Sequence, residues 1–209
     1  MQAFTYSYPT KVYFGEGAAA SALAQELPKA GRTVLLAYGG GSIKRSGIYD
    51  QLKGLLEQAG KEVVEFSGIM ANPTYAKAQE GAALARRRHV DFILAVGGGS
   101  VIDCCKVIAA QAVLEEDIWQ MEYQEGRMPS GGIPMGAVVT ASGTGAEMNN
   151  GAVITYLWRG VFRLAGLVDM GQSQFAQGVL VVEAGISGVQ NVHHVELCQT
   201  GGHGPIAEK

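Results

Sequence analysis

Residues 91–103, with the sequence DFILAVGGGSVID, decide the fold of this chain. Apolar and β-favouring residues come first, three glycines follow, and Ser100 stands three residues before Asp103. This order is typical of a strand, a tight turn and a helix that is capped at its start. After the turn, apolar residues recur at helical spacing, at Val101, Cys105, Ile108 and Ala112. We therefore expect the helix to pack one apolar stripe against a sheet.

The turn formed by Gly97, Gly98, Gly99 and Ser100 has the properties of a phosphate-binding loop. Glycines have no Cβ, so backbone N–H groups can come close to an anion, and the positive end of the following helix attracts it. The hydroxyl of Ser100 is expected either to cap the helix or to bind a phosphate oxygen. A ligand-free turn, with Ser100 and Asp103 forming a capping box, explains the same residues.

Strands and helices alternate along most of the chain. The pattern predicts strands at residues 4–8, 11–14, 33–38, 62–66, 91–96 and 134–140. Between them it predicts helices at residues 17–27, 47–59 and 74–88, and a further helix after residue 100. This alternation indicates an α/β fold, with a parallel sheet that helices cover on both faces.

Two further loops follow predicted strands, at the edge where open α/β sheets bind ligands. Gly39, Gly40, Gly41 and Ser42 repeat the GGGS sequence directly after the strand at residues 33–38. Residues 141–149 form a third loop of small and hydroxyl-bearing residues. The dinucleotide motif G-x-G-x-x-G and the P-loop motif are both absent, but three such loops on one sheet favour a nucleotide-binding crevice.

Composition narrows the class of protein. The chain has 209 residues, 47% of them hydrophobic, and a formal charge of −3, which argues for a globular domain and against a nucleic-acid surface. The basic run at residues 86–88 is expected to be the solvated last turn of a helix. Apolar runs are too short for a membrane span, and neither a signal peptide nor a disulfide or zinc pattern of cysteines is present. A cytoplasmic protein is expected.

The order of these motifs resembles the iron-containing (group III) alcohol dehydrogenase family, especially its butanol dehydrogenase-like, aldehyde-reducing branch. The matching segments are residues 9–17 (PTKVYFGEG), 38–49 (YGGGSIKRSGIY), 68–73 (GIMANP), 97–103 (GGGSVID), 133–134, 140–149 and 151–155. Together they extend over about the first three quarters of the chain.

The resemblance implies a Rossmann-like NAD(P)-binding domain over residues 1–155. Residues 97–100 would hold the pyrophosphate, and residues 39–42 would lie near the adenine ribose. Thr140 and Thr144 would help to place the cofactor, and Asp103 would also belong to the cofactor-binding site. No acidic residue follows the strand at residues 33–38 to bind a ribose 2′-hydroxyl, which favours NADP over NAD. Ala146 stands where the family usually has Ser.

The resemblance also implies a second, helical domain that binds a divalent metal, iron or zinc, through one Asp and three His. The metal would polarise the oxygen of the alcohol or aldehyde. We expect that domain to be missing here, with residues 156–209 as an atypical or truncated tail. Asp169 lies in a similar segment, but Ser173 replaces the expected His. Because His193, His194 and His203 are too closely spaced for the family's pattern, no metal site is predicted.

Two explanations of the tail stay open: a truncated or frame-shifted copy, or a short variant whose last segment adds strands to the sheet. Apolar surface left uncovered would favour self-association into a homo-oligomer. The predicted function is that of an NAD(P)-dependent alcohol dehydrogenase or aldehyde reductase acting on a small alcohol or aldehyde. The alternatives are a nucleotide-binding module without catalysis and a phosphosugar-binding α/β domain. Catalytic residues stay unassigned.

Overall fold

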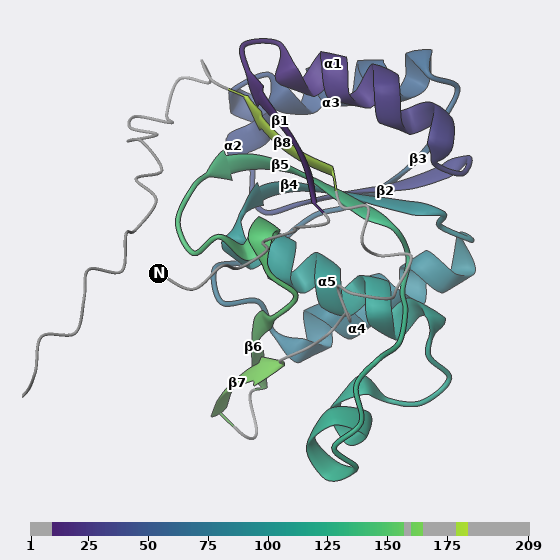
Figure 1. The fold of residues 1–209 in the computed structure, drawn as a ribbon, viewed down its shortest axis with the longest axis vertical. Helices are drawn as coiled ribbons and strands as arrows, with labels where there is room; N and C mark the ends of the chain where they lie inside the picture. Colours follow the sequence, from purple (N-terminus) through teal and green to yellow (C-terminus); the bar gives the residue numbers. More distant parts are fainter. Residues whose placement is uncertain (1–9, 157–159, 165–178, 184–209) are drawn as a thin grey trace, which may run out of the picture.

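The computed structural model describes residues 10–156, 160–164 and 179–183. A six-stranded sheet lies at its centre, between two layers of helices (Figure 1). The strand order is β1-β8-β5-β4-β2-β3, and every neighbouring pair is parallel. The strands are β1 (Lys11–Gly15), β2 (Thr33–Tyr38), β3 (Glu62–Phe66), β4 (Phe92–Gly98), β5 (Met135–Ala141) and β8 (Val179–Glu183).

Two pairs of helices cover the sheet. Helices α1 (Ala18–Glu26) and α3 (Ile48–Gln58) lie on one face, and α4 (Tyr75–Arg87) and α5 (Gly99–Val113) lie on the other (Figure 1). Four shorter helical segments complete the described helices: η1 (Leu27–Lys29), α2 (Ser42–Arg45), η2 (Gln120–Gln124) and η3 (Ala146–Met148). The predicted α/β fold, a parallel sheet with helices on both faces, is confirmed.

Strand β2 shows why the sheet strands are apolar throughout. Leu35 and Ala37 belong to the core beneath α4 and α5, while Val34 and Leu36 belong to the core beneath α1 and α3. All six residues of β2 are buried. A strand that is covered on both faces has no solvent side, so its sequence is a continuous apolar run rather than an alternating one.

The predicted element boundaries agree closely with the structure, with one informative exception. Strands β2 and β3 begin and end where the sequence predicts. Strand β4, by contrast, continues through Gly97 and Gly98, which the sequence assigns to a turn. The strand predicted at residues 4–8 lies outside the described residues.

Helix α5 differs from the one-stripe helix that the sequence predicts. Every residue from Val101 to Gln111 is buried, because α5 packs against the sheet, α4 and strand β6 (Ala152–Tyr156) at once. Strand β6 pairs antiparallel with β7 (Gly160–Leu164). The all-round burial places three polar side chains, those of Asp103, Lys106 and Gln111, inside the protein.

Arg86, one of the three basic residues at the carboxyl end of α4, binds the carboxyl end of α5. The Nε of Arg86 donates to the carbonyl of Ala112 at 3.1 Å, and its Nη2 donates to the carbonyls of Gln111 and Leu114. These carbonyls have no acceptor role left within the helix, so Arg86 satisfies them. The basic run is exposed, as predicted, but Arg86 also ties α4 to α5.

Strand β8 belongs to the segment predicted as a tail, and it pairs with β1 on one side and β5 on the other. The division of the chain after residue 155 into a domain and a tail stays a prediction. None of the helices in the described ranges is both long enough and apolar enough to cross a membrane.

Candidate functional site

A cavity of about 480 Å³ opens at the carboxyl ends of β4 and β5. Gly98 lines it from the end of β4, Gly99 and Ser100 line it from the start of α5, and Asp103 lines it from the second turn of α5. This is the edge of a parallel sheet at which α/β proteins bind their ligands. The predicted phosphate loop therefore lies in a hollow of the surface.

The opposite wall of the cavity comes from the chain that follows β5. Thr144 lines it from the loop before η3, and Ala146 lines it from η3 itself. Asn149 lines it from the segment that leads into β6, and Val153 lines it from β6. Asn72 also lines the cavity. Its φ is 54°, a left-handed conformation that Asn tolerates better than most residues. Asn149, Val153 and Asn72 are lining residues that were not predicted individually from the sequence.

The junction of β4 and α5 leaves no room for side chains at two glycines. A Cβ on Gly97 would lie 2.6 Å from Cγ2 of Val101, and a Cβ on Gly99 would lie 2.8 Å from Oγ1 of Thr144. Gly97 is buried within β4, so its missing side chain serves packing. Gly99 faces the cavity, so its missing side chain also leaves backbone open to a ligand.

The start of α5 corrects one expectation. Its N-cap is Gly98, which makes no side-chain cap hydrogen bond, and the helix begins at Gly99. Ser100 therefore lies inside the first turn and does not cap the helix, and the alternative capping box with Asp103 is wrong. The first N–H groups of a helix have no intrahelical acceptor. Without a capping side chain, they are available to an anion.

Asp103 has partners different from those of a capping box. Its Oδ2 accepts a hydrogen bond from the backbone N–H of Val153 at 3.0 Å, and its Oδ1 lies 3.4 Å from Nζ of Lys106. Lys106 also donates to Oδ1 of Asn149 at 3.2 Å and to the carbonyl of Gly151 at 2.6 Å. The two charged side chains thus connect α5 to the opposite wall of the cavity.

The ion pair is held in a poorly solvated place. The side chains of Lys106 and Asp103 are 7% and 12% exposed. Burial lowers the pKa of Lys106, and the charge of Asp103 and its hydrogen bond oppose that shift. The signal that the sequence offered was a Lys within a helix of otherwise mostly apolar residues, which is typical of a charge with a specific partner.

The second GGGS sequence lies beside this cavity but does not line it. The 39–42 loop, formed by Gly39, Gly40, Gly41 and Ser42, connects β2 to α2 at the same edge of the sheet. A Cβ on Gly39 would lie 3.0 Å from the carbonyl oxygen of Ile69 and 3.8 Å from Cγ2 of Val101, so Gly39 lies close to the start of α5. Of the predicted cofactor-binding residues, the cavity brings together Gly98, Gly99, Ser100, Asp103 and Thr144; its lining omits the 39–42 loop, Gly97 and Thr140.

Charged and aromatic side chains surround the 39–42 loop. The Nζ of Lys44 lies 4.5 Å from the ring centre of Tyr49 and 5.4 Å from that of Tyr38. Both tyrosine hydroxyls donate to the carboxylate of Glu65, and these hydrogen bonds hold its pKa below the ordinary value. Arg45 lies over Gly41, with Nη1 only 2.9 Å from the place where a Cβ would be.

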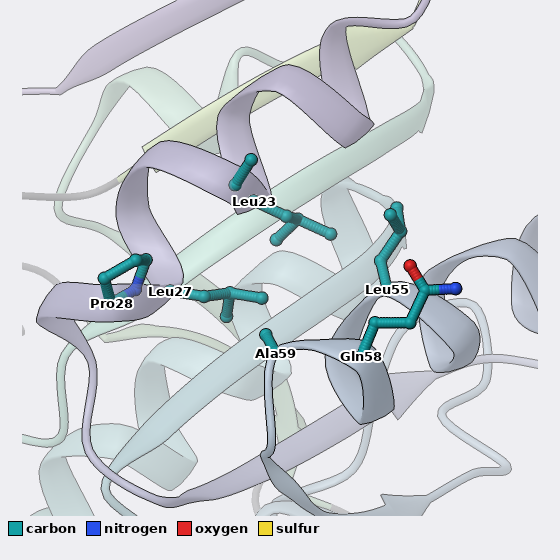
Figure 2. A pocket seen from close by; sticks show the side chains of 7 residues that line it. Leu23, Leu27, Pro28, Leu55, Gln58 and Ala59 are labelled. Atoms are coloured by element: carbon teal, nitrogen blue, oxygen red, sulfur yellow. The ribbon is translucent and has the colours of Figure 1, made fainter.

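A second cavity, of about 410 Å³, lies between α1 and α3 on the other layer of the protein (Figure 2). Leu23, Leu27 and Leu55 form much of its lining, and the polar side chain among its lining residues is that of Gln58. Among the residues that the structure describes, no charged side chain and no glycine line it. This cavity therefore has none of the features that bind a phosphate.

Comparison with known proteins tests the resemblance directly. Residues 9–163 match the family model described as iron-containing alcohol dehydrogenase. The chain belongs to the iron-containing alcohol dehydrogenase family. The family resemblance drawn from the sequence motifs is confirmed, and the match continues through β6 and most of β7.

Several members of the iron-containing alcohol dehydrogenase family are similar in sequence. A probable NADH-dependent butanol dehydrogenase 1 of Bacillus subtilis is 48% identical over 155 residues, which are 74% of this chain and 40% of that protein. The NADPH-dependent aldehyde reductase YqhD of Escherichia coli is 44% identical over 157 residues, again 74% of this chain and 40% of that protein. The chain thus spans about 40% of the length of these relatives.

Solved structures of the family have the same fold. The NADH-dependent butanol dehydrogenase A of Thermotoga maritima superposes with a TM-score of 0.77 at 36% identity, over 88% of this chain and 44% of that one. The E. coli YqhD structure superposes with a TM-score of 0.73 at 38% identity, over 87% of this chain and 44% of that one.

A metal site is not formed by the part of the chain that the structure describes. Within residues 10–156, 160–164 and 179–183, no group of three or more His, Cys, Asp and Glu side chains is arranged to hold a metal ion. Four residues whose sequence context suggested the family's ligands lie outside the described residues: Asp169, His193, His194 and His203.

Proposed function

We propose that the cavity at the carboxyl ends of β4 and β5 binds the pyrophosphate of NADPH or NADH, and that the protein interconverts small alcohols and aldehydes with this cofactor. The observation that carries the proposal is the start of α5. Gly98 and Gly99 present backbone to a cavity that Gly99 keeps clear, and no side chain caps the helix. Uncapped N–H groups and the helix dipole suit a pyrophosphate.

The proposed chemistry is hydride transfer, which the nicotinamide supplies when it is bound. The printed names of the relatives, butanol dehydrogenases and an aldehyde reductase, support a small alcohol or aldehyde as substrate. The contribution of this chain is to bind and orient the cofactor. The described residues provide no donor set for the family's metal, so no step of the proposal depends on one.

Within this proposal, NADPH is favoured over NADH. The residue after β2 is Gly39, which has no carboxylate to bind a ribose 2′-hydroxyl or to repel a 2′-phosphate. Lys44 and Arg45 lie beside the 39–42 loop and are exposed. The carboxylate of Glu65, on the adjacent strand, is occupied by two tyrosine hydroxyls and lies 3.9 Å from Nζ of Lys44. The single negative charge of Glu65 is outnumbered by the positive charges of Lys44, Arg45 and Lys53, whose Nζ lies 3.5 Å from the carboxylate, so the net charge beside the loop is positive.

Fluorescence titration with NADPH and NADH tests the binding. The test variant is Gly98→Asp, which brings a carboxylate to the proposed pyrophosphate site, and the matched control is Gly98→Asn, which has nearly the same bulk and no charge. We expect Gly98→Asp to weaken NADPH binding by at least about 30-fold, or about 2 kcal/mol, and Gly98→Asn to weaken it much less. If the unaltered, folded chain binds neither nucleotide, the proposed function is wrong.

The reaction itself is tested by turnover. Butanal and NADPH are incubated with the protein, with and without added Fe²⁺ or Zn²⁺, and oxidation of NADPH is followed by its absorbance. Butanal-dependent oxidation that Gly98→Asp abolishes is the expected result. Nucleotide binding without any turnover would indicate a binding module without catalysis, and it would contradict the catalytic part of the proposal.

A further inference from the structure

Lys106 is a buried charge that the proposed chemistry does not use. An ammonium group has three N–H donors, and Lys106 has three oxygen acceptors in reach: Asp103 Oδ1, Asn149 Oδ1 and the carbonyl of Gly151. Two of these belong to the wall of the cavity, and the third belongs to a carboxylate that lines it. A buried ion pair is weak evidence for stability, because desolvation opposes the Coulomb attraction. Because the partners of Lys106 line the cavity, the ion pair points to a role in the cavity rather than in stability.

The wall segment, residues 149–153, is organised around the same group of atoms. The backbone N–H of Gly151 donates to Oδ1 of Asn149 at 3.0 Å, and Nδ2 of Asn149 donates to the carbonyl of Gly145 at 2.8 Å. The N–H of Val153 donates to Asp103. The side chains of α5 that hydrogen-bond to this segment are thus those of Lys106 and Asp103.

We propose that Lys106 is a positioning residue of the nucleotide crevice, which fastens residues 149–153 to α5 and aims the carboxylate of Asp103 into the cavity. The proposal rests on the proposed function. Strand β4 has β2 and its 39–42 loop on one side and β5 on the other, and the cavity at its end is lined by Asp103 and the wall segment but not by the 39–42 loop. With the pyrophosphate at residues 98–100 and the adenosine toward the 39–42 loop, the nicotinamide half extends toward Asp103 and the wall segment. Lys106 thus governs the nicotinamide half alone.

The carboxylate of Asp103 retains capacity for a ligand. An ionised carboxylate has about four lone-pair sites, and the bonds to Lys106 and Val153 use two of them. A further N–H donor, such as the carboxamide of a nicotinamide, is the chemistry that suits the remaining sites. Asp103 can accept it only while Lys106 and Val153 hold the carboxylate in place.

The test compares Lys106→Met with Lys61→Met. Lys61 also holds backbone carbonyls, those of Ala30 and Gly31 at 2.8 and 2.9 Å, but it does so at the amino ends of β2 and β3, away from the cavity. Each variant is titrated with NADPH and with 2′,5′-ADP, which represents the adenosine half only. We expect Lys106→Met to weaken NADPH binding about tenfold and to leave 2′,5′-ADP binding within twofold. Lys61→Met should change neither.

Amide hydrogen exchange of the ligand-free protein provides an independent measurement. Lys106→Met should increase exchange at residues 149–153 and leave β2 and β4 unchanged. If Lys106→Met fails to fold, Asn149→Ala replaces it, because Asn149 is exposed. We expect Asn149→Ala to increase exchange at the same residues by a smaller amount. Unchanged exchange at residues 149–153, or equal loss of affinity for NADPH and 2′,5′-ADP, would overturn the proposal. If the unaltered chain binds neither nucleotide, the proposed function fails, while the exchange measurement still decides whether Lys106 holds the wall.

Discussion

The 39–42 loop and the 97–100 loop have the same four residues, GGGS, after adjacent parallel strands, yet they fold differently. Strand β2 ends before its glycines, and a helix of four residues follows. Strand β4 absorbs two of its glycines, and a buried helix of 15 residues follows. The same tetrapeptide is thus an exposed turn in one place and a tightly packed strand-to-helix junction in the other.

The difference comes from what surrounds each glycine. In the 39–42 loop, a Cβ on Gly39 would lie 3.0 Å from the carbonyl oxygen of Ile69, but one on Gly40 would meet nothing within 4 Å and one on Gly41 only the end of a flexible arginine. Cβ atoms on Gly97 and Gly99 would overlap Val101 and Thr144. A glycine motif therefore identifies an edge of the sheet, and only its packing shows which glycines are required.

The largest expected effect is on stability, at Gly97. Gly97→Ala adds a Cβ 2.6 Å from Cγ2 and 2.9 Å from Cβ of Val101, so the start of α5 has to shift. Overpacking of a buried site costs about 1–3 kcal/mol, and we expect the upper half of that range. Gly40→Ala is the matched control and should change the free energy of unfolding by less than about 0.5 kcal/mol. Urea unfolding measures both, and similar losses for the two variants would contradict the comparison.

The next effect is on nucleotide affinity, at Gly99. Gly99→Ala places a Cβ 2.8 Å from Oγ1 of Thr144, so either Thr144 or the turn has to move within the cavity. We expect NADPH to bind about tenfold more weakly, a loss of about 1.4 kcal/mol. Gly41→Ala, whose Cβ only displaces the end of Arg45, should stay within about twofold. Titration under identical salt conditions compares them, and an equal loss at both glycines would contradict different roles for the two loops.

Much of the fold and of the ligand-binding edge could be predicted from the sequence, because short segments of the chain specify them. The apolar runs of β2 and β3 and the glycine turns that follow strands specify the sheet and its ligand-binding edge. The all-round burial of α5 could not be predicted in this way, since it depends on β6, which follows α5 by about 40 residues. The roles of Lys106 and Asn149 depend on the same long-range contact. Spacing along the chain does not show that these two side chains meet.

A smaller effect concerns the choice between the two nucleotides. The double variant Lys44→Gln and Arg45→Gln removes two exposed positive charges beside the 39–42 loop. Exposed ion pairs contribute about 0.2–1 kcal/mol, so we expect NADPH to bind about fivefold more weakly and NADH to bind as before. A parallel loss for both nucleotides would show that these charges do not act on a 2′-phosphate. Titration at two salt concentrations should show a weaker salt dependence of NADPH binding in the variant.

The smallest expected effect is on the free energy of unfolding, at Glu65, which lies beside the 39–42 loop. Hydrogen bonds from Tyr49 and Tyr38 hold the pKa of Glu65 below its ordinary value of 4.5, so the ionised carboxylate stabilises the fold above pH 4.5. That contribution is lost as the pH falls through the lowered pKa. The side chain is 38% exposed, and solvent screening limits the expected loss in Glu65→Gln to about 0.5 kcal/mol at pH 7.

The matched control for Glu65 is Glu62→Gln, at the other end of β3, where the carboxylate pairs with Arg88 and accepts no hydrogen bond from a tyrosine of the described residues. Urea unfolding at pH 7 and at pH 3 separates the two positions. The difference between the unaltered chain and Glu65→Gln should shrink toward zero at the lower pH, because protonation then removes the charge that the substitution removes. A difference that stays constant with pH would mean that Glu65 acts through packing alone. In that case the tyrosine pair, and not the carboxylate charge, would support the 39–42 loop.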